Sequence, residues 1–219
     1  MTSPRRTSVL EPFIATVILI GLTRVLTRLP LFADSQLLIF AALGIYGPIA
    51  LALLRRRPIP TFERTWRELG RGIGWFGMAS LAVFPAYGLA AHLWQTRMIG
   101  QHWIGWATIP SAGMILTQCF FIALPEEFFF RGYVQPILED AWKTRWRTLG
   151  ASLGPGWIIT CLVFAFAHSV VAYRWWHFAI FFPSLVFGYL RARTGGIVAP
   201  TLFHATANLF TDWLVHCYR

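Results

Sequence analysis

The chain has 219 residues, of which 56% are hydrophobic and only 13% are charged. A soluble domain carries about 25% charged residues, so this composition excludes a water-soluble globular protein and predicts that lipid surrounds most of the chain. The net charge of +10 does not indicate a nucleic-acid partner, because the basic residues form short clusters between apolar runs, as in loops beside anionic lipid headgroups.

Apolar runs separated by proline and glycine predict the membrane helices. In chain order they cover residues 9–28, 36–54, 72–95, 108–139, 153–170, 175–191 and 196–215. One span takes about 20 residues, so the chain has room for roughly six to eight of them. We therefore expect an all-α fold, a polytopic transmembrane helical bundle of about seven helices, in which residues 1–219 form a single domain.

The first and fourth runs have features of their own. Arg5 and Arg6 precede the first run as they would in a signal peptide, but Glu11-Pro12 interrupts it and no clear cleavage site follows, so we expect this helix to be retained. The fourth run is long, and we expect it to continue past the membrane as an amphipathic segment. Its end carries a charged cluster of Glu139, Asp140, Lys143, Arg145 and Arg147.

The distribution of basic residues predicts the orientation of the bundle. With seven helices and a cytoplasmic N-terminus, 14 of the 19 Lys and Arg residues, Arg131 among them, fall in inner segments and five in outer ones. The positive-inside rule expects such a bias. We therefore predict a cytoplasmic N-terminus and a C-terminus on the opposite side.

Two adjacent glutamates, Glu126 and Glu127, interrupt the fourth apolar run. A carboxylate in the bilayer costs at least about 2.5–3.5 kcal/mol on insertion scales, so the pair needs an explanation. Glu127 and Arg131 are four residues apart on a helix and can form an ion pair. Glu126 points about 100° away, so it needs a partner on another helix or a bound proton, and such a carboxyl suits general acid–base catalysis. A purely structural Glu–Arg pair would leave Glu126 unexplained.

Polar side chains also interrupt two later helices. His168 follows an apolar stretch that begins at Phe164, and His204 and Asn208 share one face of their helix with small residues between them. Each of these residues alone could be an interhelical hydrogen-bonding group. Together with Glu126, however, two imidazoles and a carboxamide on three helices have the composition of a hydrolytic site.

Three motifs, Glu-Glu-x-x-x-Arg (126–131), Phe-x-x-x-His (164–168) and His-x-x-x-Asn (204–208), occur in this order on hydrophobic helices. They resemble the CPBP family of CAAX-processing and bacteriocin-processing intramembrane proteases. The flanking stretches 130–133 and 195–200 are similar to the family as well. The resemblance covers about residues 108–215, which we expect to hold the catalytic core, whereas the first hundred residues carry no motif.

The resemblance implies a glutamate-dependent endopeptidase that hydrolyses a peptide bond without a metal or other cofactor. Carried over by position, Glu126 would be the general base for a water that His168 helps to hold. His204 and Asn208 would stabilise the oxyanion, and Glu127 and Arg131 would be structural supports.

The resemblance also implies a membrane-associated protein or peptide as the substrate. Family members remove C-terminal tripeptides from prenylated proteins, trim leader peptides or process C-terminal sorting tails, and the sequence does not select among these. Its one lysine against eighteen arginines indicates a GC-rich bacterial source, hence the bacterial inner membrane. There we favour a peptide or the hydrophobic tail of a secreted protein. The sequence does not indicate an oligomeric state.

Three alternatives stay open. Glu126, His168 and His204 could instead bind zinc with a water as fourth ligand, although the His-Glu-x-x-His spacing is absent and asparagine is a poor zinc ligand. The chain could also be an inactive membrane immunity or scaffold protein of the same fold. A transporter or proton pathway would predict repeated halves, which the sequence does not show.

Overall fold

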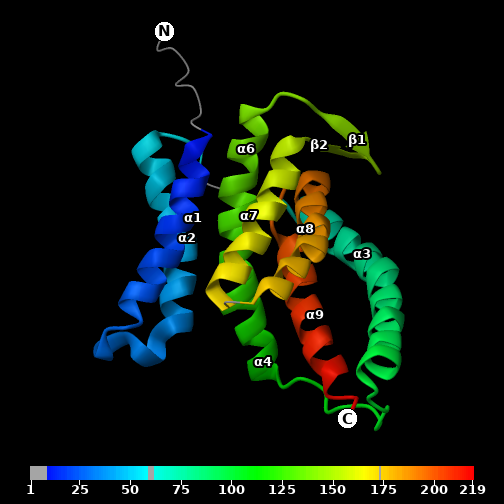
Figure 1. Ribbon diagram of the computed structural model, residues 1–219. Coiled ribbons are helices and arrows are strands. Elements are labelled where there is room, and N and C mark those ends of the chain that lie inside the picture. Colours follow the sequence, from blue (N-terminus) through cyan, green and yellow to red (C-terminus); the bar gives the residue numbers. More distant parts are fainter. Residues whose placement is uncertain (1–8, 59–61, 173) are drawn as a thin grey trace.

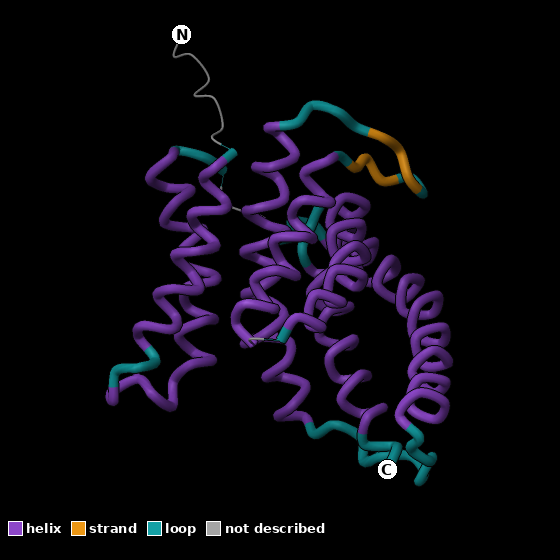
Figure 2. The backbone as a smooth tube through the Cα atoms, viewed as in Figure 1, coloured by secondary structure: helices purple, strands orange, loops and turns teal. Residues whose placement is uncertain are grey.

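The structure, a computed structural model, describes residues 9–58, 62–172 and 174–219. The predictions for Arg5 and Arg6 lie outside these ranges. Helices make up most of the described chain (Figures 1 and 2), and an all-α bundle of about seven helices is confirmed for it. They are α1 (Leu10–Leu26), α2 (Gln36–Arg55), α3 (Trp66–Leu93), a long helix (Ala112–Ala141), α7 (Pro155–Ala172), α8 (Phe181–Thr194) and α9 (Val198–Val215).

Shorter helical segments extend, join or divide these helices. In the long helix, two segments have the wider turn of a π-helix, a feature frequently found at functional sites. Its parts are α4 (Ala112–Leu116), η3 (Thr117–Ala123), α5 (Leu124–Glu127), η4 (Phe128–Val134) and α6 (Gln135–Ala141), with η3 and η4 as the π segments. Elsewhere the short segments are η1 (Pro30–Ser35) between α1 and α2, η2 (Trp94–Ile99) after α3, and η5 (Trp175–Ile180) before α8.

Helix α3 begins at Trp66, six residues before the predicted start. The hydroxyl of Thr65 accepts a hydrogen bond from the backbone N–H of Glu68 (3.2 Å), and the Glu68 carboxylate accepts one from the backbone N–H of Arg64 (2.8 Å). This reciprocal arrangement is a form of capping box, which satisfies backbone donors that the first turn leaves free. The Thr-x-x-Glu spacing was present in the sequence, but hydropathy alone placed the start later.

The amphipathic continuation predicted beyond the long helix is wrong. The helix ends at Ala141, and Arg147 lies in strand β1 (Trp146–Thr148), which pairs antiparallel with β2 (Ala151–Leu153). The two residues between the strands, Leu149 and Gly150, have φ angles of 47° and 79°. Positive φ at both central residues is the requirement of a tight hairpin turn, and Gly150 meets it without steric cost.

The long helix occupies the middle of the bundle (Figure 1). It contacts α2 on one side and α7 and α9 on the other, while α1 packs on α2 and α3 packs on α8 and α9. Buried aromatic side chains fill the space between these helices and surround the glutamate pair. The phenylalanines of this core are Phe129, Phe130, Phe164, Phe187 and Phe203.

The bundle has two different ends. One end carries the β1–β2 hairpin and is here called the hairpin end (Figure 1). Four helices begin there, namely α1, α3, α7 and α9, and three helices end there, namely α2, α6 and α8. The α1–α2 connection and the C-terminus lie at the opposite end. The predicted inner segments meet at the hairpin end, but Arg131, which was counted with them, is fully buried within the bundle.

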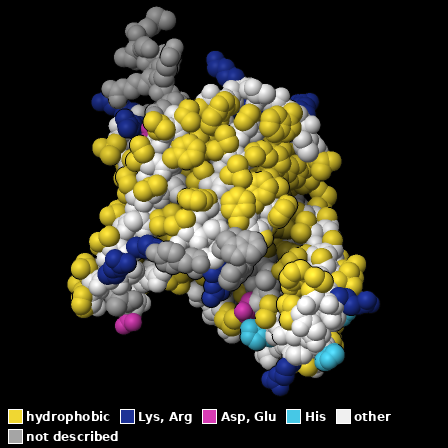
Figure 3. All heavy atoms as spheres, in the orientation of Figure 1, with side chains coloured by type: hydrophobic (Ala, Val, Ile, Leu, Met, Phe, Trp, Pro, Cys, Tyr) yellow, Lys and Arg dark blue, Asp and Glu magenta, His cyan; other side chains and the backbone are white. Residues whose placement is uncertain are grey.

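The outer surface suits a lipid environment. Three helices in the described chain are long and apolar enough to cross a membrane, namely Gln36–Arg55, Trp66–Ile99 and Ala112–Ala141. Figure 3 shows hydrophobic side chains over much of one face, with Lys and Arg mainly at its margins. Apolar side chains in the middle and cations at both rims are the pattern expected of a protein that spans a bilayer.

Candidate active site

Glu126 and Glu127 lie on α5, in the middle of the long helix and between its two π segments. Pro125 precedes them and has no backbone N–H, so it weakens the regular helix at this point. Helix α2 approaches closely here, because a Cβ atom at Gly44 would lie only 3.1 Å from the Cβ of Pro125. Both glutamates are buried, Glu127 completely and Glu126 with 7% of its surface exposed.

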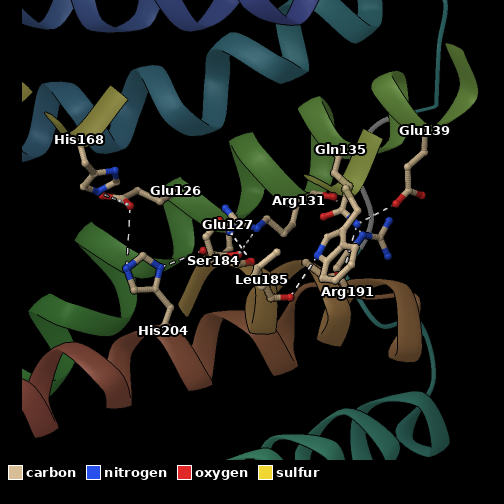
Figure 4. A network of polar contacts seen from close by, with 12 residues as sticks. Glu126, Glu127, Arg131, Gln135, Glu139, His168, Ser184, Leu185, Arg191 and His204 are labelled. Carbon is tan, nitrogen blue, oxygen red and sulfur yellow. Dashed lines mark hydrogen bonds and ion pairs between the residues drawn. The ribbon is translucent and has the colours of Figure 1, made fainter. Parts of the chain in front are cut away.

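The carboxylate of Glu126 faces two histidines from other helices (Figure 4). Its Oε2 atom lies 3.4 Å from Nε2 of His168 on α7 and 3.9 Å from Nε2 of His204 on α9. The sequence predicted a partner for Glu126 on another helix, and the structure places two histidines, on α7 and α9, near its carboxylate. Both contacts are longer than an ordinary hydrogen bond of about 2.7–3.2 Å, so the three groups surround a small space.

Hydrogen bonds at the other ring nitrogens orient both imidazoles. Nδ1 of His168 lies 2.9 Å from the backbone carbonyl of Phe164, and Nδ1 of His204 lies 2.9 Å from the Glu127 carboxylate. A carbonyl and an ion-paired carboxylate can only accept, so each Nδ1 carries the hydrogen. When the ring is neutral, its Nε2 therefore presents a lone pair toward Glu126.

Glu127 is the hub of a second, fully buried network. The predicted pair with Arg131 is present, with 3.3 Å between Glu127 Oε2 and Arg131 Nε. Arg131 also donates from Nη2 to the hydroxyl (2.7 Å) and the carbonyl (3.2 Å) of Ser184 on α8. Its guanidinium carbon lies 4.4 Å from the ring centroid of Phe164, which adds a cation–π contact. Neither His204 nor Ser184 was predicted as a partner in this network.

Asn208 lies one turn after His204 on α9 and is half-buried. Its Nδ2 atom donates a hydrogen bond to Oε1 of Gln118 on η3, at 3.1 Å. Sequence reasoning missed Gln118, and the available signal was an amide within an otherwise apolar run. The bond uses one of the two Nδ2 hydrogens, so the second remains for another acceptor.

A cavity of about 600 Å³ opens beside Glu126 and His168. It lies between α1, α2, the long helix and α7, and most of its wall is apolar. Its volume falls within the range of about 300–1,000 Å³ that is usual for ligand sites. The buried carboxylate is thus accessible to a molecule of moderate size.

In the described chain, no group of three or more His, Cys, Asp and Glu side chains has an arrangement that could hold a metal ion. The three residues proposed as zinc ligands do converge, but both imidazoles face the same Glu126 oxygen. In the structure these three residues place one carboxylate and two nitrogen bases around a small space.

Residues 107–210 match the family model described as "Type II CAAX prenyl endopeptidase Rce1-like". This segment, slightly less than half of the chain, is similar to that family. The matched segment contains all three motifs, and the CAAX-protease resemblance is confirmed. No curated protein and no solved structure matches the chain significantly. CAAX endopeptidases are intramembrane proteases, and together with the apolar spans this makes the chain an integral membrane protein.

Proposed function

We propose that the chain is an active intramembrane endopeptidase in which Glu126 activates water to hydrolyse a peptide bond. The observation that carries this proposal is the convergence of two imidazole Nε2 atoms, from α7 and α9, on one oxygen of a buried carboxylate beside a cavity. A buried carboxylate and two bases that serve only to stabilise the fold would not need access to such a space.

The reaction follows from these groups. A water between Glu126 and His168 gives a proton to the Glu126 carboxylate, and its oxygen bonds to the scissile carbonyl carbon. The carbonyl oxygen becomes an oxyanion. As it collapses, the C–N bond breaks and Glu126 returns the proton to the leaving nitrogen, so that one peptide bond and one water yield a carboxylic acid and an amine.

His204 and Asn208 are the proposed oxyanion donors. Because Nδ1 of His204 already donates to Glu127, its Nε2 can donate only when the ring is an imidazolium. Glu127 is therefore more than a support for the helix, since its carboxylate accepts this hydrogen bond and orients the His204 ring. Asn208 contributes its second Nδ2 hydrogen.

The proposed substrate is a membrane-associated protein or peptide. The catalytic core that cuts it is formed by residues 108–215 of this chain. We place the chain in the bacterial inner membrane with a cytoplasmic N-terminus, which the cluster of arginines near the hairpin end supports. The cavity is lined by the last turns of α1 and α7, at the opposite end. In that orientation the site opens away from the cytoplasm, which favours the hydrophobic tail of an exported protein as substrate.

Replacing the proposed base is the direct test. Glu126→Gln keeps the shape of the side chain but cannot take a proton, so cleavage of a co-expressed membrane substrate should fall below detection. Glu139→Gln is the matched control, since Glu139 lies on the same helix and bonds to Gln135, away from the histidines. Peptides retained by the Glu126→Gln protein, identified by mass spectrometry, would supply the substrate.

Cleavage that persists in Glu126→Gln would contradict the proposal. No cleavage by the parent protein on the substrates retained by Glu126→Gln would favour the inactive immunity or scaffold alternative. The zinc alternative has its own outcome, in which a strong chelator abolishes the activity and zinc restores it. We expect the chelator to leave the activity unchanged.

A further inference from the structure

The cavity beside Glu126 has two chemically different ends. Glu126 and His168 form one end, and polar or basic residues of the last turn of α1 and of the α1–α2 connection form the other. The wall between them is apolar, formed mainly by Leu19, Ile20, Leu37, Phe40, Ile122 and Phe130. A ligand that fills this space should therefore be apolar along its length and anionic at the end away from Glu126.

Two arginines supply the positive charge at that end. Nη2 of Arg24 donates to the last carbonyls of α7, at 3.1 Å from the oxygen of Val170 and 2.8 Å from that of Val171. Arg28 lies one turn further on, lines the same cavity and is exposed. Among the described residues, no acidic side chain, Asp34 of the same connection included, forms an ion pair with Arg28. Its guanidinium is thus available to an anion.

The spacing between the two ends matches a short extended peptide. Val171 is three residues beyond His168 on α7, and Arg28 is four residues beyond Arg24. At about 1.5 Å per helical residue, these steps separate Arg28 from His168 by roughly 10 Å along the axes of α1 and α7. An extended chain covers about 3.3 Å per residue, so roughly two to four residues would bridge this distance.

We propose that Arg28 binds the C-terminal carboxylate of the substrate and so determines which peptides enter the site. This deepens the proposed hydrolase function and rests on it for the identity of the ligand. The negative charge of Glu126 at one end and the two guanidinium groups at the other would orient the chain with its carboxylate away from the base. A guanidinium fork also matches a carboxylate geometrically.

The test measures binding rather than turnover. The Glu126→Gln protein in nanodiscs of phosphatidylcholine is mixed with short apolar peptides, each present both as the free acid and as the C-terminal amide. Native mass spectrometry then compares the retained forms. We expect free acids to be retained about tenfold or more over amides. The preference should vanish when Arg28→Gln is added, return in part with Arg28→Lys, and survive Arg97→Gln, an exposed arginine outside the cavity.

Equal retention of acids and amides would overturn the proposal. A phospholipid phosphate has the same chemistry as a carboxylate, so a second set of nanodiscs contains phosphatidylglycerol. Loss of bound phosphatidylglycerol in Arg28→Gln, without any acid preference among the peptides, would make this a headgroup site and overturn the proposal as well. If the acid preference depends on Arg28 but the parent protein cleaves nothing, the anion site stands and the hydrolase function fails.

Discussion

Each of the two adjacent glutamates has a different set of partners, and the difference separates their roles. The carboxylate of Glu127 is fully buried between Arg131 and His204, so removing it would leave a buried arginine without its counter-ion. Breaking such a pair typically costs about 3–5 kcal/mol of folding free energy. The carboxylate of Glu126 lies 3.4 and 3.9 Å from the Nε2 atoms of His168 and His204 and faces a cavity, so we expect its charge to serve chemistry rather than stability.

Asn208→Ala tests the proposed oxyanion donor at the scale of a single residue. Loss of one such donor typically lowers turnover by about 10²–10³, and we expect this in the cleavage rate measured with the identified substrate. The unfolding temperature in detergent should change little, because Asn208 is only half-buried and makes one side-chain hydrogen bond. Gln118→Ala removes the partner that orients the amide and should cause a smaller loss. A fall in activity that follows a fall in stability would indicate a structural role instead.

Some residues of the candidate site could be predicted from the sequence and others could not. Glu126, Glu127, His168, His204 and Asn208 stood out because polar groups are costly in apolar helices. The Glu127–Arg131 pair followed from helical spacing. Contacts between helices are set by packing, which no local spacing encodes. The bonds from His204 to Glu127 and from Asn208 to its glutamine partner therefore appeared only in the structure.

At the scale of elements, the seven helices were predictable because each apolar run is long enough to be one. Their ends were less so, since capping and turns decide them. The start of α3 depends on the side chains of Thr65 and Glu68, and the long helix ends where Trp142 adopts an extended backbone conformation, well before the hairpin turn. These local features carry little hydropathy signal, so a charged stretch beyond Ala141 resembled a helix.

The contact between α6 and α7 depends on a glycine. A Cβ atom at Gly156 would clash with the backbone nitrogen of Glu139, so Gly156→Ala must push the start of α7 away from α6. We expect destabilisation of about 1–3 kcal/mol or more, with loss of cleavage because α7 also carries His168. Gly47→Ala on α2 is the control, since nothing lies within 4 Å of its added methyl group. Equal unfolding temperatures for the two variants would contradict this account.

At the scale of the whole molecule, the orientation in the membrane decides which substrates can reach the cavity. The helices alternate in direction, and the basic segments that follow α2 and α6 and lie at the end of α8 meet at the hairpin end (Figure 1). The cavity is lined by residues near the opposite end. From the positive-inside rule we expect the hairpin to face the cytoplasm and the peptide to enter from the other side.

Single cysteines at two equally exposed leucines test this orientation. Leu149 in the hairpin turn is 81% exposed, and Leu31 in the α1–α2 connection is 82% exposed. Each is changed to cysteine after Cys119, Cys161 and Cys217 are replaced by alanine, and intact bacterial cells are treated with a membrane-impermeant maleimide. We expect Leu31→Cys to react at once and Leu149→Cys only after the membrane is permeabilised. The reverse pattern would place the cavity mouth in the cytoplasm, where a cytoplasmic protein with a hydrophobic C-terminus would be the substrate to look for.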